Sequence, residues 1–273
     1  MALTRRSAIA TLTGIAFTPA VAFAGTPTTL NWYAGRVDGE RHLERNADGV
    51  LPAASVIKLL IALALIEDAQ ANRVDLATKV ALTREDRVGG SDRFGAAPAG
   101  RYPAGTLIDA MLSLSDNTAS NALLRAVGMP RCNEVAAAHG LRATRIRRRF
   151  YDWAAQRRGL ENETTPRESA KMMLLIAHEA QASRAGSVVA QAAMRALLAQ
   201  SDRETIPSAL PSRRDVANKT GELPGVRNDV GIIGYGHAGA YVIAILDRYG
   251  NSSRTSAIAA IRDVVRAVDR RLG

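Results

Sequence analysis

The chain has 273 residues, of which 47% are hydrophobic and 23% charged, proportions that are typical of a globular protein and exclude a disordered or fibrous one. Aromatic residues make up only 4%, too few for a stacking surface that binds single-stranded nucleic acid. The formal net charge is +10, but the densest basic run, Arg142 to Phe150, is more typical of a solvated face than of a nucleic-acid patch. We therefore expect no nucleic-acid partner.

Residues 1–24 have the features of an export signal. Arg5 and Arg6 precede the apolar run AIATLTGIAF, and the small residues Ala22 to Ala24 fit a cleavage site before Gly25. The arginine pair is typical of a twin-arginine signal, and a plain secretory signal is the alternative. Later segments are too short or too polar to span a bilayer. The sequence thus predicts an exported protein, periplasmic or secreted, without stable membrane insertion.

After residue 24, the predicted elements are first strands, then helices, and then strands again. A strand is expected over 29–35 with a charged hairpin after it, helical periodicity dominates 55–200, and β-rich runs follow from about 214 to 247 before a closing helix over 252–272. This order predicts an α/β fold in which both ends of the chain build one sheet domain, 25–54 plus 201–273. The all-helical domain, 55–200, is inserted between them.

The segment GYGHAG, Gly234 to Gly239, matches the spacing of a dinucleotide-binding motif. Such a motif must open a helix, so that the helix N-terminus meets the pyrophosphate. Here the glycines lead into AYVIAILD, a predicted strand, so a hairpin turn explains them better.

The cysteine and histidine residues are too few and too scattered to form a disulfide or a metal site. Cys132 is the only cysteine and has no partner for a disulfide within the chain. The four histidines show no metal-ligand spacing. We expect neither a metal nor any other cofactor.

The stretch ASVIKLLIALALIEDA, which starts at Ala54, carries a hydroxyl and an amine at the head of an apolar helix. Ser55 and Lys58 are three residues apart and therefore share one helix face. Desolvation penalises the ammonium form, so burial would lower the pKa of Lys58 and allow it to act as a base for a serine nucleophile. Taken alone, the pair is also compatible with a lysine whose stem lies along the helix and whose amine reaches solvent.

Two further clusters follow. LSLSDNTASN places Ser115, Asp116 and Asn117 between two helical runs, where they can face a cleft, and one of the three is expected to cap the second helix. ANKTGELPG places Lys219, Thr220 and Gly221 on a strand, where alternation points Lys219 and Gly221 to one face. An edge strand that ends in a glycine turn is the alternative for the latter.

In this order and spacing, the three clusters resemble the SxxK, SDN and KTG motifs of class A β-lactamases and penicillin-binding proteins. The resemblance extends from Gly25 to the C-terminal helix. It implies a serine hydrolase with an antiparallel sheet flanked by helices. By resemblance, Ser55 would be the nucleophile, Lys58 its partner in acylation, and Ser115 the relay of a proton to the leaving nitrogen.

The remaining roles follow from the same resemblance. Asn117 would bind the side-chain amide of the substrate or support the lysine, and Lys219 and Thr220, on the strand that continues into Gly221, would hold the substrate carboxylate. The backbone N–H groups of Ser55 and Glu222 would form the oxyanion hole. A nearby Lys219 would also favour a neutral Lys58.

The chain departs from the class A pattern in the loop between the second and third motifs. Class A enzymes carry Glu-x-x-Leu-Asn there, and its glutamate activates the deacylating water; here the loop segment has Phe150 near that place. Asp152 is the nearest carboxylate and is predicted to activate water instead; the alternative is an aspartate that binds the backbone of its own loop. Glu161 and Glu163 are expected to pair with Arg145 or Arg148.

The sequence therefore predicts an exported serine hydrolase, expected to be monomeric, in which a β-lactam acylates Ser55 and the ester is then hydrolysed. The alternatives are a D,D-peptidase or esterase that acts on a peptidoglycan-derived substrate, and a penicillin-binding protein that deacylates slowly. Loss of general-base assistance, worth about 10²–10⁴-fold, would separate a lactamase from such a target.

Overall fold

The computed structural model describes residues 28–39, 41–182, 187–211 and 214–273, and the predicted export signal lies outside these ranges. Strands from the two ends of the chain pair into a five-stranded sheet in which every neighbouring pair is antiparallel. The strands are, in spatial order, β2 (His42–Arg45), β1 (Thr29–Arg36), β9 (Tyr241–Arg248), β8 (Val226–Ile233) and β7 (Val216–Leu223).

Eight α-helices and several short elements complete the part of the chain that the structure describes. The helices are α1 (Lys58–Gln70), α2 (Ala104–Ser113), α3 (Asn117–Val127), α4 (Met129–Ala138), α5 (Trp153–Arg157), α6 (Pro166–Gln181), α7 (Ser187–Leu198) and α8 (Arg254–Leu272). The 3₁₀ turns are η1 (Ala54–Ile57), η2 (Arg84–Asp86) and η3 (Pro207–Ala209). Two small ladders pair β3 (Leu51–Pro52) with β6 (Glu163–Thr164), and β4 (Lys79–Leu82) with β5 (Gly100–Pro103).

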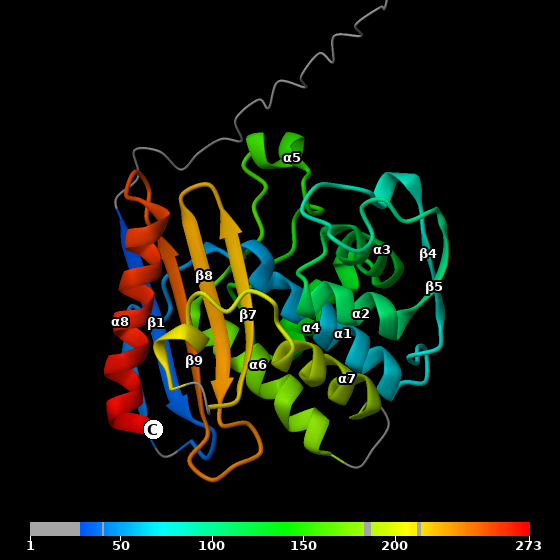
Figure 1. Ribbon diagram of the computed structural model, residues 1–273. Coiled ribbons are helices and arrows are strands. Elements are labelled where there is room, and N and C mark those ends of the chain that lie inside the picture. Colours follow the sequence, from blue (N-terminus) through cyan, green and yellow to red (C-terminus); the bar gives the residue numbers. More distant parts are fainter. Residues whose placement is uncertain (1–27, 40, 183–186, 212–213) are drawn as a thin grey trace, which may run out of the picture.

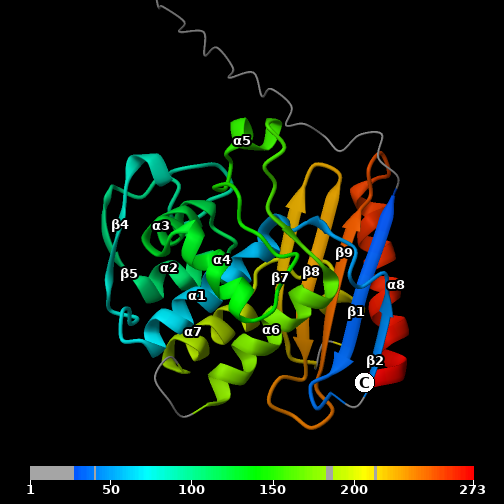
Figure 2. The ribbon, with the colours of Figure 1, turned by 180° about the vertical axis from the view of Figure 1, so that it is seen from behind.

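Helices cover both faces of the sheet. α8 lies on one face, where Ile261 and Val265 join the same apolar cluster as Ile243 and Ile245 of β9 (Figure 1). α6 packs on the other face against β1, β8 and β9 (Figure 2). This arrangement confirms the predicted α/β class, an antiparallel sheet from both termini flanked by helices. The boundary between the two domains stays a prediction, because one apolar cluster contains both helical and sheet residues.

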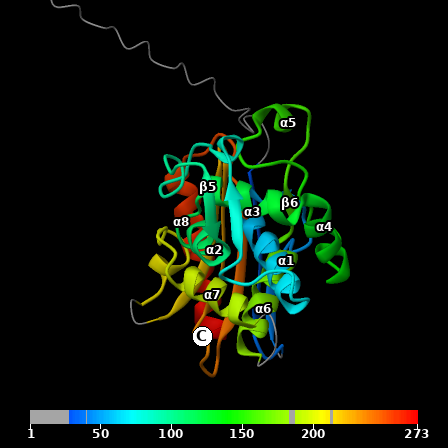
Figure 3. The same cartoon turned by 90° about the vertical axis from the view of Figure 1, so that its right-hand side faces the viewer.

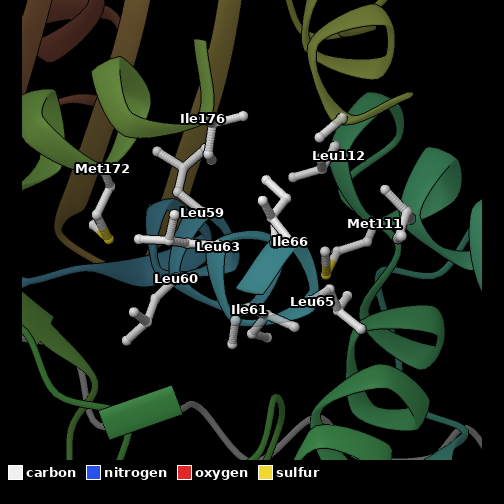
Figure 4. Close-up of a cluster of buried hydrophobic side chains, with 14 of the residues drawn as sticks. Leu59, Leu60, Ile61, Leu63, Leu65, Ile66, Met111, Leu112, Met172 and Ile176 are labelled. Carbon is white, nitrogen blue, oxygen red and sulfur yellow. The ribbon is translucent and has the colours of Figure 1, made fainter. Parts of the chain in front are cut away.

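Helix α1 runs through the centre of the helical part. Ten of its thirteen residues are buried, which is expected for a helix that is apolar on all sides. Its leucines and isoleucines contact Met172 and Ile176 of α6 on one side and Met111 and Leu112 of α2 on another (Figure 4). The turn η1, which leads directly into α1, contacts strand β7.

The glycine-rich segment before β9 is a turn, as predicted. Gly234, Gly236 and Gly239 have φ of 71°, 83° and 82°, a left-handed backbone that glycine adopts without steric cost. The segment continues into β9 and not into a helix. In the described ranges, no helix is long and apolar enough to cross a membrane.

Candidate active site

The turn that carries Ser55 is held by strands β7 and β8. Ala54, which precedes it, has φ +48°, a strained conformation for a residue with a Cβ. Asn228 fixes this turn by donating from Nδ2 to the carbonyl oxygens of Pro52 and Ala53, at 2.9 and 3.2 Å. A Cβ on Gly221 would lie 3.0 Å from the Ser55 nitrogen. A side chain at the glycine of the third motif would crowd the backbone of the nucleophile turn, because β7 passes directly against it.

The three predicted clusters meet at Ser115. Lys58 Nζ lies 3.0 Å from Ser115 Oγ, 2.7 Å from the Ser115 carbonyl oxygen and 2.8 Å from Asn117 Oδ1. Lys219 Nζ lies 2.9 Å from the same Oγ. One hydroxyl thus joins two lysines that come from opposite parts of the chain. The structure brings Lys58, Ser115, Asn117 and Lys219 into direct contact.

Burial controls the charge of both lysines, whose side chains are fully buried. Desolvation, and then the nearby charge of Lys219, hold the pKa of Lys58 well below its usual range. Desolvation also lowers the pKa of Lys219, to about 7. Both expected causes of a neutral Lys58 are confirmed. The site can therefore supply an uncharged amine near neutral pH.

The middle residue of the second cluster is the expected helix cap. Asp116 Oδ1 accepts from the Ala119 nitrogen at the start of α3, and Oδ2 accepts from the Arg93 and Phe94 nitrogens. This fully buried carboxylate fixes the loop on which Ser115, at φ +57°, turns its hydroxyl toward the lysines. The cap is thus part of what positions the second cluster.

Strand alternation separates the residues of the third cluster, as predicted. Lys219 and Gly221 face Ser115 and the nucleophile turn. A hydrogen bond from Thr220 instead helps to keep the pKa of Asp202 low, and Thr220 does not line the cavity beside Ser55. Its role in holding a substrate carboxylate stays a prediction.

Arg227 of β8 was missed by the sequence reasoning. It is cross-strand partner to Glu222, is buried, and donates to Glu222 Oε2 at 2.6 Å and to Asp202 at 2.8 Å. Counting residues across the two-residue turn Pro224–Gly225 would have placed it opposite Glu222, whose backbone N–H is a predicted oxyanion donor. Arg227 holds the Glu222 side chain beside the cavity.

A cavity of about 510 Å³ opens beside Ser55. It lies between the β7–β8 turn and the loop of residues 148–162. This loop carries α5, which lies at one end of the molecule (Figure 3). Ser55 Oγ makes no hydrogen bond to any described residue, and the hydrogen bonds of Lys58 Nζ go to Ser115 and Asn117. The residues that line the cavity are Ala54, Ser55, Asn117, Arg148, Phe150, Tyr151, Trp153, Arg157, Glu161, Asn162, Glu222, Leu223, Pro224 and Tyr249.

The loop of residues 148–162 is closed by a buried ion pair. Arg148 donates to Glu161 Oε1 at 3.0 and 2.7 Å, as the sequence predicted for one of the two glutamates. Glu163 contacts the side chain of Arg147, a neighbour of the arginines that were expected. The pair holds the two ends of the loop together, so the residues between them keep a defined position above Ser55.

Phe150 lies near the start of this loop, close to Lys58. Asn121 binds both backbone groups of Phe150, at 3.0 Å to its nitrogen and 3.2 Å to its oxygen. The Phe150 ring lies 4.7 Å from Lys58 Nζ. An apolar ring therefore lies beside the amine. The sequence comparison had placed this residue near the position of the class A glutamate.

The structure does not bring Asp152 to the cavity. Its Oδ1 accepts from the Ala155 nitrogen at 2.9 Å and caps α5, and the residue is absent from the cavity lining. This geometry corresponds to the alternative role that the sequence left open, a carboxylate that binds the backbone of its own loop. In the described ranges, no group of three or more His, Cys, Asp or Glu residues could hold a metal ion.

The sequence and fold are similar to those of known proteins. A sequence model of the β-lactamase enzyme family matches residues 17–272. The structure of PBP-A is 24% identical, with a TM-score of 0.79 over 91% of each chain. A β-lactamase from Xanthomonas campestris pv. campestris is 20% identical, with a TM-score of 0.79 over 91% of this chain and 94% of that one.

An ancestral class A β-lactamase is 22% identical, with a TM-score of 0.77 over 89% of this chain and 94% of that one. No curated protein sequence gives a significant match. These solved structures share the fold, and the family model covers nearly the whole chain. With the geometry above, this shows that the chain is a serine hydrolase and belongs to the β-lactamase enzyme family.

Proposed function

We propose that a β-lactam acylates Ser55 and that the resulting ester is then hydrolysed. The observation that carries this proposal is the Ser115 hydroxyl, bonded to both Lys58 and Lys219 beside the nucleophile turn. Two buried amines that share one hydroxyl form a path along which a proton can move. A purely structural role would not require such a path.

In acylation, a neutral Lys58 would accept the proton of the Ser55 hydroxyl as Oγ bonds to the lactam carbonyl carbon. The backbone N–H groups of Ser55 and Glu222 would bind the oxyanion. The lactam C–N bond then breaks, and Ser115 delivers a proton to the nitrogen while Lys58 restores the proton of Ser115. Lys219 in its charged form would attract the carboxylate of the substrate.

Slow deacylation is the second candidate, and three observations favour it. Phe150 lies where a water-activating carboxylate was expected, and Asp152 caps α5. Glu161, unlike Asp152, lines the cavity, but its carboxylate is already bonded to Arg148, to Gln156 and to the backbone nitrogen of Asn162. An acyl-enzyme without a free base nearby would persist, as in a penicillin-binding protein.

Mass spectrometry with benzylpenicillin tests both parts. We expect one adduct of intact penicillin mass per chain, located on Ser55 by peptide mapping and absent from Ser55→Ala. The lifetime of the adduct then separates the candidates, because turnover within seconds indicates a lactamase and persistence for many minutes a binding protein. No adduct, or an adduct on another residue, contradicts the proposal.

We also propose that the protein is exported. The support is the arginine pair and the cleavage site in residues 1–24, which lie outside the described ranges. N-terminal sequencing of protein recovered outside the cytoplasm should begin at Gly25. Recovery of the full-length chain from the cytoplasm alone would contradict export.

A further inference from the structure

Four charged side chains line the cavity beside Ser55: Arg148, Arg157, Glu161 and Glu222. All but Arg157 form ion pairs that neutralise their charge. Arg148 pairs with Glu161 at 2.7 Å. Glu222 pairs with Arg227 at 2.6 Å and with Arg254 at 2.8 Å.

Arg157 is the exception. It is the last residue of α5, it is exposed, and it lines the cavity. Unlike the other three, it has no carboxylate partner within the described residues. Once the pairs are counted, a single guanidinium therefore faces the cavity from the α5 side without a counter-charge.

Apolar and aromatic side chains also line the cavity. Tyr151 and Trp153 stand on the loop that carries α5, with their rings edge to face at 5.1 Å. Leu223 and Pro224 come from the β7–β8 turn. A carbon chain or ring can lie between these two walls and lose water on both sides, because both are largely apolar.

We propose that Arg157 is a specificity-determining residue, and that the preferred substrates carry an anionic group at the end of an apolar acyl side chain. The side chain lies between the aromatic pair and the β7–β8 turn, and the anion binds Arg157. This inference rests on the proposed acylation of Ser55. It adds the chemical class of the side chain, an acyl group that ends in a carboxylate.

Matched penicillins that differ in side-chain charge alone test it. We expect 6-adipamidopenicillanic acid, which ends in a carboxylate, to acylate faster than its neutral hexanoyl analogue, by about three- to tenfold at low ionic strength. Carbenicillin and benzylpenicillin form a second pair, in which the extra carboxylate lies next to the amide. The carboxylate on the lactam ring system is common to all four compounds and cancels in each ratio.

Arg157→Gln should bring the adipyl-to-hexanoyl ratio to about one. Arg158→Gln is the matched control, because it removes the same charge from the next, exposed residue, which does not line the cavity, and it should keep the ratio. Equal ratios in the parent and in Arg157→Gln overturn the inference, even if all four penicillins label Ser55. A lack of labelling by every compound instead overturns the proposed function.

Discussion

Lys58 and Lys219 are two buried amines that cannot both hold a full charge without cost. They share the hydroxyl of Ser115, and burial lowers the pKa of each. Neighbouring positive charges raise the cost further, because each disfavours protonation of the other. The arrangement disfavours a full charge on both amines at once, which suits an uncharged base beside a carboxylate-binding cation.

The pKa of Lys219, about 7, predicts how carboxylate recognition depends on pH. Lys219 is cationic below this pKa and loses its charge as the pH rises through it. We expect the ratio of acylation rate constants for benzylpenicillin and its methyl ester to fall as the pH rises from 6 to 8. The ester lacks the carboxylate, so any effect of Lys58 on the nucleophile cancels in the ratio. A ratio that is constant or rises over this range would refute the assignment of Lys219.

Among the elements, α5 and its loop decide what lies above Ser55. The Arg148–Glu161 pair holds the two ends of the loop together, and Asn121 binds the backbone of Phe150 near its start. A helix as short as α5 has little stability of its own, so its cap contributes a large part of what holds it. The side chains of Trp153 and Arg157 depend on that helix for their place in the cavity.

Two substitutions of Asp152 separate its cap from a role in deacylation. Asparagine is also a good cap, so Asp152→Asn should keep both the stability and the rate of deacylation of a chromogenic cephalosporin. Asp152→Ala loses the cap, and we expect it to lower the free energy of unfolding by about 1 kcal/mol. If Asp152 activates water, both variants would deacylate more slowly, by a similar factor. Denaturant unfolding and stopped-flow kinetics on the two proteins decide between these outcomes.

For the whole molecule, one buried carboxyl group makes stability depend on pH. Asp247 on β9 is 4% exposed, and burial raises its pKa to about 7. The folded chain therefore binds this proton more tightly than the unfolded chain. This contribution to stability is complete below about pH 4 and is lost as the pH rises through about 7, by about 1.4 kcal/mol for each unit between the folded and unfolded pKa values.

Asp247→Asn should remove this dependence. In thermal unfolding, we expect the melting temperature of the variant to rise relative to that of the parent as the pH goes from 5 to 8. Asp263→Asn is the matched control, because Asp263 is exposed on α8, the helix that covers this face. A parent and an Asp247→Asn variant whose stabilities change in parallel from pH 5 to 8 would show that Asp247 does not ionise in this range.

Much of the fold was predictable from periodicity. The spacing of apolar residues predicted helical structure over 55–200 and a closing helix over 252–272. The structure places α1 to α7 within the first range and α8 within the second, because amphipathic and apolar helices repeat their apolar residues every three to four positions. The short elements β3 to β6 were not predicted. Ladders of two to four residues contain too few residues for a pattern, and tertiary contacts alone stabilise them.

The sequence by itself determined the residue types and their local setting: a serine and a lysine one turn apart, a capped loop, and a strand with an alternating lysine and glycine. These depend on short-range geometry, which spacing specifies. Only the tertiary structure decided that Ser115 joins both lysines, that the Phe150 ring lies beside Lys58, and that Asn228 holds the nucleophile turn. Those contacts connect residues far apart in the chain, and which side chain reaches a partner depends on packing that no local pattern records.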